Sequence, residues 1–304
     1  MTAPGLAGDT QQRPVDSRAR RLARWLYTRP RAQLALLLAA PVLWVGVVYI
    51  GSLVVLLLNA FWEKDAFTGN VTPFAWTLKA FVDIFTKPVY ATVALRTVGI
   101  AIAVTLADAL LAFPIAYYMA RIASPRARGA LLVAVLMPLW AAYLVKAFAW
   151  RTILQGNGFL SWVLTPFGIP GPGLTQLFNA WLVLSYLWLP YMILPIYSGL
   201  ERIPSSLLEA SSDLGAKAGT TFRRVVLPLV FPALVAGSIF TFSLSLGDYI
   251  VPDLVADAKF IGNVIYDNSS LGNLPVAAAY SLFPIAIMLV YLVIARRLGA
   301  FESL

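Results

Sequence analysis

Six intervals of the chain are long and almost free of charged residues. They lie between residues 31 and 63, 96 and 121, 128 and 146, 178 and 197, 224 and 248, and 267 and 296. A helix needs about 20 residues to cross a hydrocarbon core of about 30 Å, so each interval is predicted to span a membrane once. Membrane strands are excluded because they alternate over about 10 residues, whereas these runs are continuously apolar.

The composition supports the same prediction. The chain has 304 residues, of which 60% are hydrophobic and 12% charged, and its mean hydropathy is +0.78. A soluble domain does not tolerate these values, so we predict an all-α membrane protein. The expected segments are an Arg-rich tail (1–31), a first transmembrane helix (32–62), a core of five further transmembrane helices (63–298) and a short tail (299–304). The first apolar run, of about 30 residues, is too long for the core of a signal peptide and is expected to stay attached.

The basic residues predict the orientation. Placing both termini in the cytoplasm puts most of the 23 lysines and arginines on the inner side, in the tail, around residues 121–128, in the loop 201–228 and after the last span. Basic residues stay on the cytoplasmic side during insertion, so the net charge of +9 is a signal of orientation, and we expect a multi-pass protein with both termini inside. This charge does not indicate nucleic-acid binding. The arginine-rich tail can also contact anionic lipid.

Several kinds of chemistry are excluded by missing residues. The chain has no cysteine and no histidine, which removes disulfides, thiolate and imidazole catalysis and most zinc or haem ligation. It has no Walker-type phosphate loop. The energy for any transport must therefore come from a gradient or from a partner.

The loop 201–228 is unusually polar for this chain. Ser206 and Glu209 have the spacing of a capping box, so a helix is predicted to begin there, and Gly215 is placed to end it. Thr220 or Thr221 is expected to cap a second short helix, which carries Phe222, Val225 and Val226 and ends where Pro228 leads into the next span.

The first loop helix has a small apolar face formed by Leu207, Ala210, Ser211 and Leu214. One interpretation is an amphipathic element that rests on lipid headgroups. Small residues in the middle of this face and acidic residues beside it fit a protein socket better, because an anionic membrane surface repels carboxylates.

The sequence EAS at 209–211, Gly215, and VVLP at 225–228 resembles the EAA loop of permease subunits of ABC importers. That pattern usually has alanine at the third position, where this chain has Ser211. The stretches MPLWAAYLVKAFAWRTILQGNG, SLGDYIVPDLV and IGNVI resemble the first permease subunit of spermidine/putrescine-type importers. The resemblance runs from Leu34 onward and leaves out the first 31 residues.

The resemblance implies a type I ABC importer permease fold, the bacterial inner membrane as the location, and a set of partners. These are a second permease subunit in a heterodimer, two ATP-binding subunits that hold ATP and Mg, and an extracytoplasmic solute-binding protein. It implies no cofactor on this chain and no enzymatic activity. The residues implied to dock the ATP-binding subunit are Leu207, Glu209, Ala210, Asp213, Leu214, Gly215, Phe222 and Pro228.

Five other residues are candidates for the translocation pathway. Asp108 lies near the middle of the second span, where a carboxylate is costly; it is either a structural contact or a residue that meets a cationic substrate. Asp248 and Tyr249 end the fifth span and begin the most acidic external loop, in which Asp253, Asp257 and Asp267 follow. Trp140 and Tyr143 belong to an interfacial aromatic belt or hold an ammonium group.

Two other classes of protein fit less well. An intramembrane aspartyl protease needs two facing aspartates, and SLGD at 245–248 only half resembles its motif. A gradient-driven secondary transporter has no need of an ATPase-docking loop. The resemblance implies polyamines as the favoured substrate, with an amino acid derivative or a metal-ion complex as the alternative.

Overall fold

The computed structural model describes residues 27, 29–65, 69–72, 75–168 and 177–299. Most of the predicted N-terminal tail and all but the first residue of the C-terminal tail lie outside the described residues. The chain divides into two units, residues 1–56 and 57–304. The first unit contains α2 (Pro30–Leu43), the π-helical turn η1 (Trp44–Ile50) and the beginning of α3 (Gly51–Asn59). Its apolar helix is long enough to cross a membrane over residues 33–59.

The second unit is almost entirely helical. Its elements in chain order are β1 (Glu63–Lys64), β2 (Val71–Thr72), α4 (Lys79–Thr86), α5 (Pro88–Tyr117), η2 (Tyr118–Ile122), α6 (Pro125–Trp140), α7 (Tyr143–Leu154), α8 (Phe159–Leu164), η3 (Thr165–Phe167), α9 (Leu177–Glu201), α10 (Ser205–Asp213), α11 (Ala218–Thr221), η4 (Phe222–Val226), α12 (Leu227–Gly247), α13 (Ile250–Val255), α14 (Ile261–Ser270) and α15 (Leu274–Arg297). The two short strands pair antiparallel.

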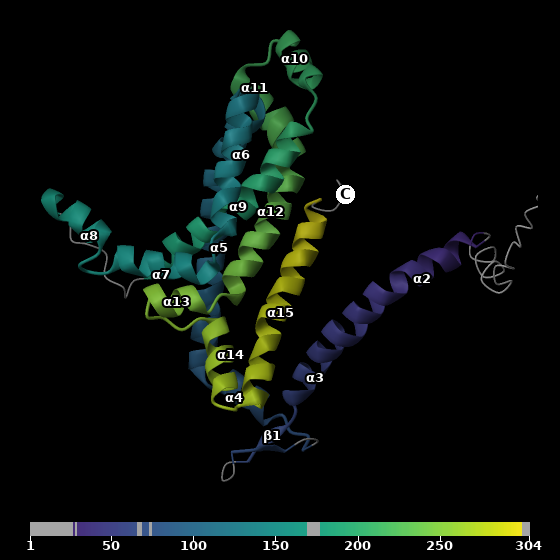
Figure 1. Ribbon diagram of the computed structural model, residues 1–304, viewed down its shortest axis with the longest axis vertical. Coiled ribbons are helices and arrows are strands. Elements are labelled where there is room, and N and C mark those ends of the chain that lie inside the picture. The colour runs from purple at the N-terminus through teal and green to yellow at the C-terminus, as the bar shows by residue number, and fades with distance from the viewer. Residues whose placement is uncertain (1–26, 28, 66–68, 73–74, 169–176, 300–304) are drawn as a thin grey trace, which may run out of the picture. The chain divides into compact units, whose positions relative to one another are not determined.

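Three long helices, α5, α9 and α12, pack against one another and form the centre of this unit (Figure 1). Two glycines allow α9 and α12 to approach closely. A Cβ at Gly199 would lie 2.6 Å from the Cβ of Ala233, and one at Gly237 would lie 2.9 Å from the sulfur of Met192. Small residues at helix contacts are the usual means of close packing in a membrane, because lipid provides no hydrophobic driving force.

The prediction of an all-α membrane protein is confirmed. Among the described residues, five helices are long and apolar enough to cross a membrane, and a bent pair of helices brings the number to as many as six. The bent pair corrects the predicted third span, since the interval 128–146 does not form one straight helix. It breaks after Trp140, and the following helix turns by 92°.

The break between α6 and α7 has a local cause. Ala141 and Ala142 are extended, with ψ of 136° and 135°, so the last carbonyls of α6 lose their helical partners. The Lys146 ammonium donates to one of them, the carbonyl of Pro138, at 3.0 Å. Lys146 therefore stabilises the end of α6 from the next helix, which explains a lysine beside an apolar interval.

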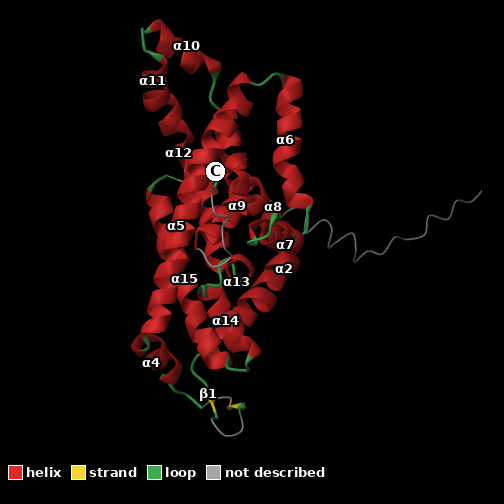
Figure 2. Ribbon diagram, turned by 90° about the vertical axis from the view of Figure 1, so that its left-hand side faces the viewer, coloured by secondary structure: helices red, strands yellow, loops and turns green. Residues whose placement is uncertain are grey.

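The second unit has two different ends. The loop of α10 and α11 lies at one end, and α4, β1 and α14 lie at the other, in both views (Figures 1 and 2). The turn between α5 and α6 lies at the same end as α10, because Arg121 of this turn contacts the end of α9. Basic residues from separate loops thus collect at the α10 end.

Candidate functional site

The helix α10 begins earlier than the sequence predicted. It runs from Ser205 to Asp213, and Pro204 is its N-cap, with no capping bond from a side chain. The predicted capping box of Ser206 and Glu209 is therefore wrong. Ser206 already lies in the first turn, because Pro204 has the extended backbone that precedes a helix and leads directly into it.

The predicted end of this helix at Gly215 is confirmed. Gly215 has a φ of +76°, its amide donates to the Ser212 carbonyl at 2.8 Å, and the next amide, of Ala216, donates to the Ser211 carbonyl at 3.1 Å. These two bonds form a Schellman motif, which satisfies the last carbonyls of a helix and requires a left-handed residue. The chain therefore turns back sharply at a fixed point.

Several residues of α10 and its C-cap are exposed and available to a partner. Leu214 is 88% exposed and Leu207 is 44% exposed. Glu209, Ala210 and Asp213 are exposed as well. Two exposed leucines beside two carboxylates make a small amphipathic surface of the kind the sequence predicted.

Phe222 lies elsewhere than the predicted docking surface. Its ring contacts those of Phe113 and Tyr117 on α5, with centroids 5.4 and 6.5 Å apart and near-perpendicular planes. Leu208 of α10 packs against the same apolar cluster. Phe222 is thus half-buried against α5, and its contact with the partner stays a prediction.

The second predicted helix of the loop is not a separate element. It begins at Ala218, after the N-cap Lys217, so neither Thr220 nor Thr221 caps it. It continues through η4 into α12 as one helix of 30 residues. Pro228 does not break this helix, because the π-helical turn directly before it rearranges the hydrogen bonds that a proline would disrupt.

A hydrogen bond joins the two arms of the loop. The hydroxyls of Ser211 on α10 and Thr221 on α11 lie 2.8 Å apart. Ser211 is the position at which the chain departs from the EAA pattern. The hydroxyl therefore ties α10 to the start of the long helix that ends in α12.

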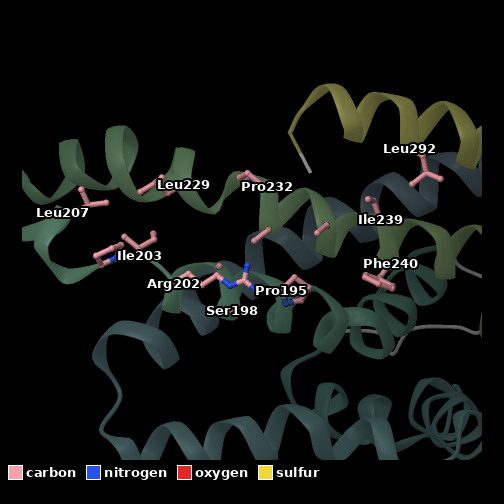
Figure 3. Close-up of a pocket in the computed structure, with 14 residues that line it drawn as sticks. Pro195, Ser198, Arg202, Ile203, Leu207, Leu229, Pro232, Ile239, Phe240 and Leu292 are labelled. Carbon is pink, nitrogen blue, oxygen red and sulfur yellow. The ribbon is translucent and has the colours of Figure 1, made fainter. Parts of the chain in front are cut away.

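An apolar groove of about 640 Å³ lies beside the loop, between α9 and α12. Leu207 and Ile203 line its end near α10, and Phe240 and Leu292 line the far end (Figure 3). Arg202 is the one charged residue among the described residues that line it. The sequence did not predict this groove, because its lining residues come from α9, α10, α12 and α15 and from the connection between α9 and α10.

Three of the five pathway candidates meet at the other end of α12. Tyr143, Asp248 and Tyr249 line a pocket of about 360 Å³ together with Trp188. The Tyr143 hydroxyl donates a short hydrogen bond to Oδ2 of Asp248, and the Tyr143 ring stacks on Trp188 at 5.9 Å. A helix of 21 residues is about 30 Å long, so α12 separates this pocket from the α10 loop by about the thickness of a membrane core.

Asp248 is held in place by backbone as well. Its Oδ1 accepts from the amides of Ile250 and Val251, both at 3.0 Å, at the start of α13. Burial raises the pKa of this carboxyl above its ordinary value, although the hydrogen bonds from Tyr143, Val251 and Ile250 oppose the shift. The pocket thus presents a fixed carboxylate among three aromatic rings.

The other two candidates lie apart from this pocket. Trp140 is 86% exposed at the end of α6 and is not among the residues that line it. Asp108 is completely buried between α5 and α9, and neither of its carboxylate oxygens has a hydrogen-bond partner in the part of the chain that the structure describes. The Ser185 hydroxyl of α9 interacts with it at longer range. This burial favours a structural role for Asp108.

The acidic loop after α12 is partly neutralised. Lys259 contacts Asp253 and Asp267, with N–O distances of 3.1 Å in both pairs. These contacts raise the pKa of Lys259. Asp257 is exposed and takes no part in the ion pairs found among the described residues, so the loop carries less free negative charge than the sequence indicated.

Comparisons with known proteins agree with this geometry. Residues 112–301 match a family described as "Binding-protein-dependent transport system inner membrane component". The chain is 44% identical over 315 residues to the Escherichia coli "Inner membrane ABC transporter permease protein YdcU", covering 98% of this chain and 100% of that protein. It is 33% identical to the "Spermidine/putrescine transport system permease protein PotB" of Haemophilus influenzae, covering 70% of this chain and 76% of that protein.

Solved structures share the fold at low identity. A chain of a bacterial alginate ABC transporter, in complex with an alginate pentasaccharide-bound periplasmic protein, aligns with a TM-score of 0.69. The alignment covers 92% of this chain and 97% of that one at 17% identity. This likeness concerns the fold alone.

Proposed function

Because the chain belongs to the family of binding-protein-dependent transport system inner membrane components, we propose that it imports polyamines and couples their passage to ATP hydrolysis through α10. It is the permease subunit of an ABC importer, a multi-pass protein of the inner membrane, and is not itself an enzyme. Membership of this family rules against the gradient-driven transporter considered from the sequence.

The proposed contact with the ATP-binding subunit is the exposed side of α10. Leu207 and Leu214 fill apolar depressions of that subunit, and Glu209 and Asp213 form polar contacts beside them. ATP and Mg bind to the partner, where hydrolysis occurs. Support comes from the exposure of both leucines and from the Schellman turn that fixes their position.

The observation that carries the substrate class is the pocket of Tyr143, Trp188, Asp248 and Tyr249. A carboxylate among aromatic rings suits an alkylammonium group, because the charge is attracted by the carboxylate and by the faces of the rings. The names of relatives at 33% identity support polyamines. An amino acid derivative with an ammonium group, or a metal-ion complex, is the alternative solute.

The proposed assembly contains one second permease subunit, two ATP-binding subunits and an extracytoplasmic solute-binding protein, all within membrane lipid. The α10 end of the bundle faces the cytoplasm, and both termini lie on that side. The clustering of Arg121, Arg128, Arg202 and Lys217 at this end supports the orientation, because basic loops remain cytoplasmic.

Reconstitution of the whole complex in proteoliposomes tests the proposal. ATP-dependent uptake of labelled spermidine or putrescine is expected, and Asp248→Asn should weaken it. Asp257→Asn is a matched control, because it removes the same charge from an exposed position in the same loop, and asparagine tolerates its φ of 45°. Uptake of another solute without polyamine uptake would overturn the substrate class, and uptake that ignores ATP would overturn the coupling.

A further inference from the structure

Arg121, in the turn between α5 and α6, binds the end of a different helix. Its guanidinium donates to the carbonyl of Leu200 at 2.5 Å and to that of Ile203 at 2.7 Å. Both carbonyls belong to the last turn of α9 and the residues that follow it, where a helix leaves its carbonyls without partners. A cation there is also favoured by the helix dipole.

Arg128 also binds backbone carbonyls, here those of η2, the helical turn that precedes its own helix. Its guanidinium donates to the carbonyls of Met119 and Ala120 at 3.0 and 3.1 Å, at the end of η2. A third contact reaches Glu201 at 3.4 Å, and Glu201 also accepts from the Tyr197 hydroxyl at 3.1 Å. The ion pair is largely exposed and contributes little, so the carbonyl contacts carry most of the attachment.

These contacts lie directly before the helix α10. Ile203, whose carbonyl Arg121 holds, is 6% exposed and packs in the apolar cluster of α5, α9 and η4. Pro204 follows, and α10 begins at Ser205. The connection from α9 to α10 is therefore short, anchored by its side chain and fixed at its backbone.

We propose that Arg121 and Arg128, together the arginine bracket, are positioning residues that make α10 move as one body with the turn between α5 and α6. The bracket touches no solute and no nucleotide. It transmits the displacement of α10 to α5 and α6, which the sequence does not connect to the loop directly. This inference rests on the proposed docking of α10 to the ATP-binding subunit.

A third arginine supplies the control. Arg126 lies five residues from Arg121 in the first turn of α6, is exposed, and has no ion pair or side-chain hydrogen bond among the described residues. Arg121→Gln and Arg126→Gln therefore remove the same charge at neighbouring positions, but only the first removes bonds to α9. Losing a charge-assisted hydrogen bond of this kind shifts the population of the closed bracket by about tenfold.

The test measures distance and coupling in the complete reconstituted complex. The chain has no cysteine, so spin labels can be placed at Ala130→Cys on α6 and Ser206→Cys on α10, both exposed positions. With arginine at 121, one narrow distance is expected, unchanged by ATP. With Arg121→Gln the distance should broaden and change on ATP binding, and the ATP hydrolysed per solute imported should rise. Arg126→Gln should match the wild type in both measurements.

The outcomes separate this inference from the docking proposal. Failure of the ATP-binding subunit to associate with the wild-type permease would count against docking. Normal association of Arg121→Gln, with wild-type distance and coupling, would overturn the bracket. If Arg121→Gln does not assemble, Arg121→Lys keeps the positive charge, but its ammonium sits on a shorter side chain than Nη2, the nitrogen of Arg121 that makes both bonds. The same changes at smaller size are then expected, and a wild-type distance with wild-type coupling would overturn the bracket.

Discussion

Replacing Gly215 with alanine should loosen the end of α10 without any steric clash. A Cβ at this position would have no other atom within 4 Å, so space does not limit the substitution. The backbone conformation limits it instead, because φ is +76° and an L-residue with a side chain is strained in the left-handed region. The cost is about 1–2 kcal/mol.

This strain should weaken the hydrogen bonds of two amides in the Schellman motif. The amides of Gly215 and Ala216 donate to the carbonyls of Ser212 and Ser211, and both bonds depend on the left-handed turn. A destabilisation of about 1–2 kcal/mol raises the open population about 5- to 30-fold. Hydrogen exchange at residues 215 and 216, followed by mass spectrometry of the purified permease, should accelerate by that factor.

Gly219→Ala is the matched control for this prediction. Gly219 lies in α11, four residues along the same loop; a Cβ there also meets nothing within 4 Å, and its φ is not positive. Alanine should be neutral or slightly favourable in that helix. Gly215→Asn should fall between the two, since asparagine tolerates the left-handed region. Equal exchange rates in Gly215→Ala and Gly219→Ala would refute the argument from φ.

Five further substitutions test the site. Glu209→Lys should leave insertion and thermal stability near the wild type but abolish solute-stimulated ATP hydrolysis, and normal transport by this variant would contradict the docking role of α10. Phe222→Ala should destabilise the permease by about 2 kcal/mol, because its ring packs on α5, and this should lower the melting temperature. Leu214→Ala changes a position that is 88% exposed, so it should keep the melting temperature and weaken only association with the ATP-binding subunit. Asp108→Asn should keep uptake and substrate preference, and a large loss of uptake would restore Asp108 to the pathway. Burial raises the pKa of Asp248 above its ordinary value, so this carboxylate is protonated at a higher pH than an ordinary aspartate. Cation uptake should therefore decline in the wild type as pH is lowered and stay flat at its lower level in Asp248→Asn.

The sequence was sufficient to predict those features that depend on nearby residues alone. Long uncharged runs are compatible only with membrane helices, and Gly215 ends α10 because a left-handed turn favours glycine. The exposed surface of α10 could also be predicted, since Leu207 and Leu214 recur at helical spacing among polar residues.

The sequence was insufficient where partners come from distant helices. No residue close to Phe222 in the sequence indicates that its ring packs against Phe113 and Tyr117. Likewise, no residue close to Trp188 in the sequence indicates that it stacks on Tyr143. The predicted capping box was wrong for a different reason. Two helix-start signals lie close together, and α10 begins directly after Pro204 and not at Ser206. Arg121 was counted as an orientation signal, although its hydrogen bonds extend to residues 79 and 82 positions further along the chain.

The attachments of α10 decide how a movement of the loop can reach the pocket at Asp248. On one side, the Ser211–Thr221 bond joins α10 to a helix that runs without a break through α12 to that pocket. On the other side, the connection through Ile203 is fixed to α9 and to the turn between α5 and α6. A loop held on one side alone would rotate about its attachment when pulled. A loop held on both sides displaces α5, α9 and α12 together. These helices pack on one another, with glycines at the α9–α12 contact, so bending one of them alone would lose packing contacts. The geometry therefore favours rigid-body movement of the three central helices over local gating.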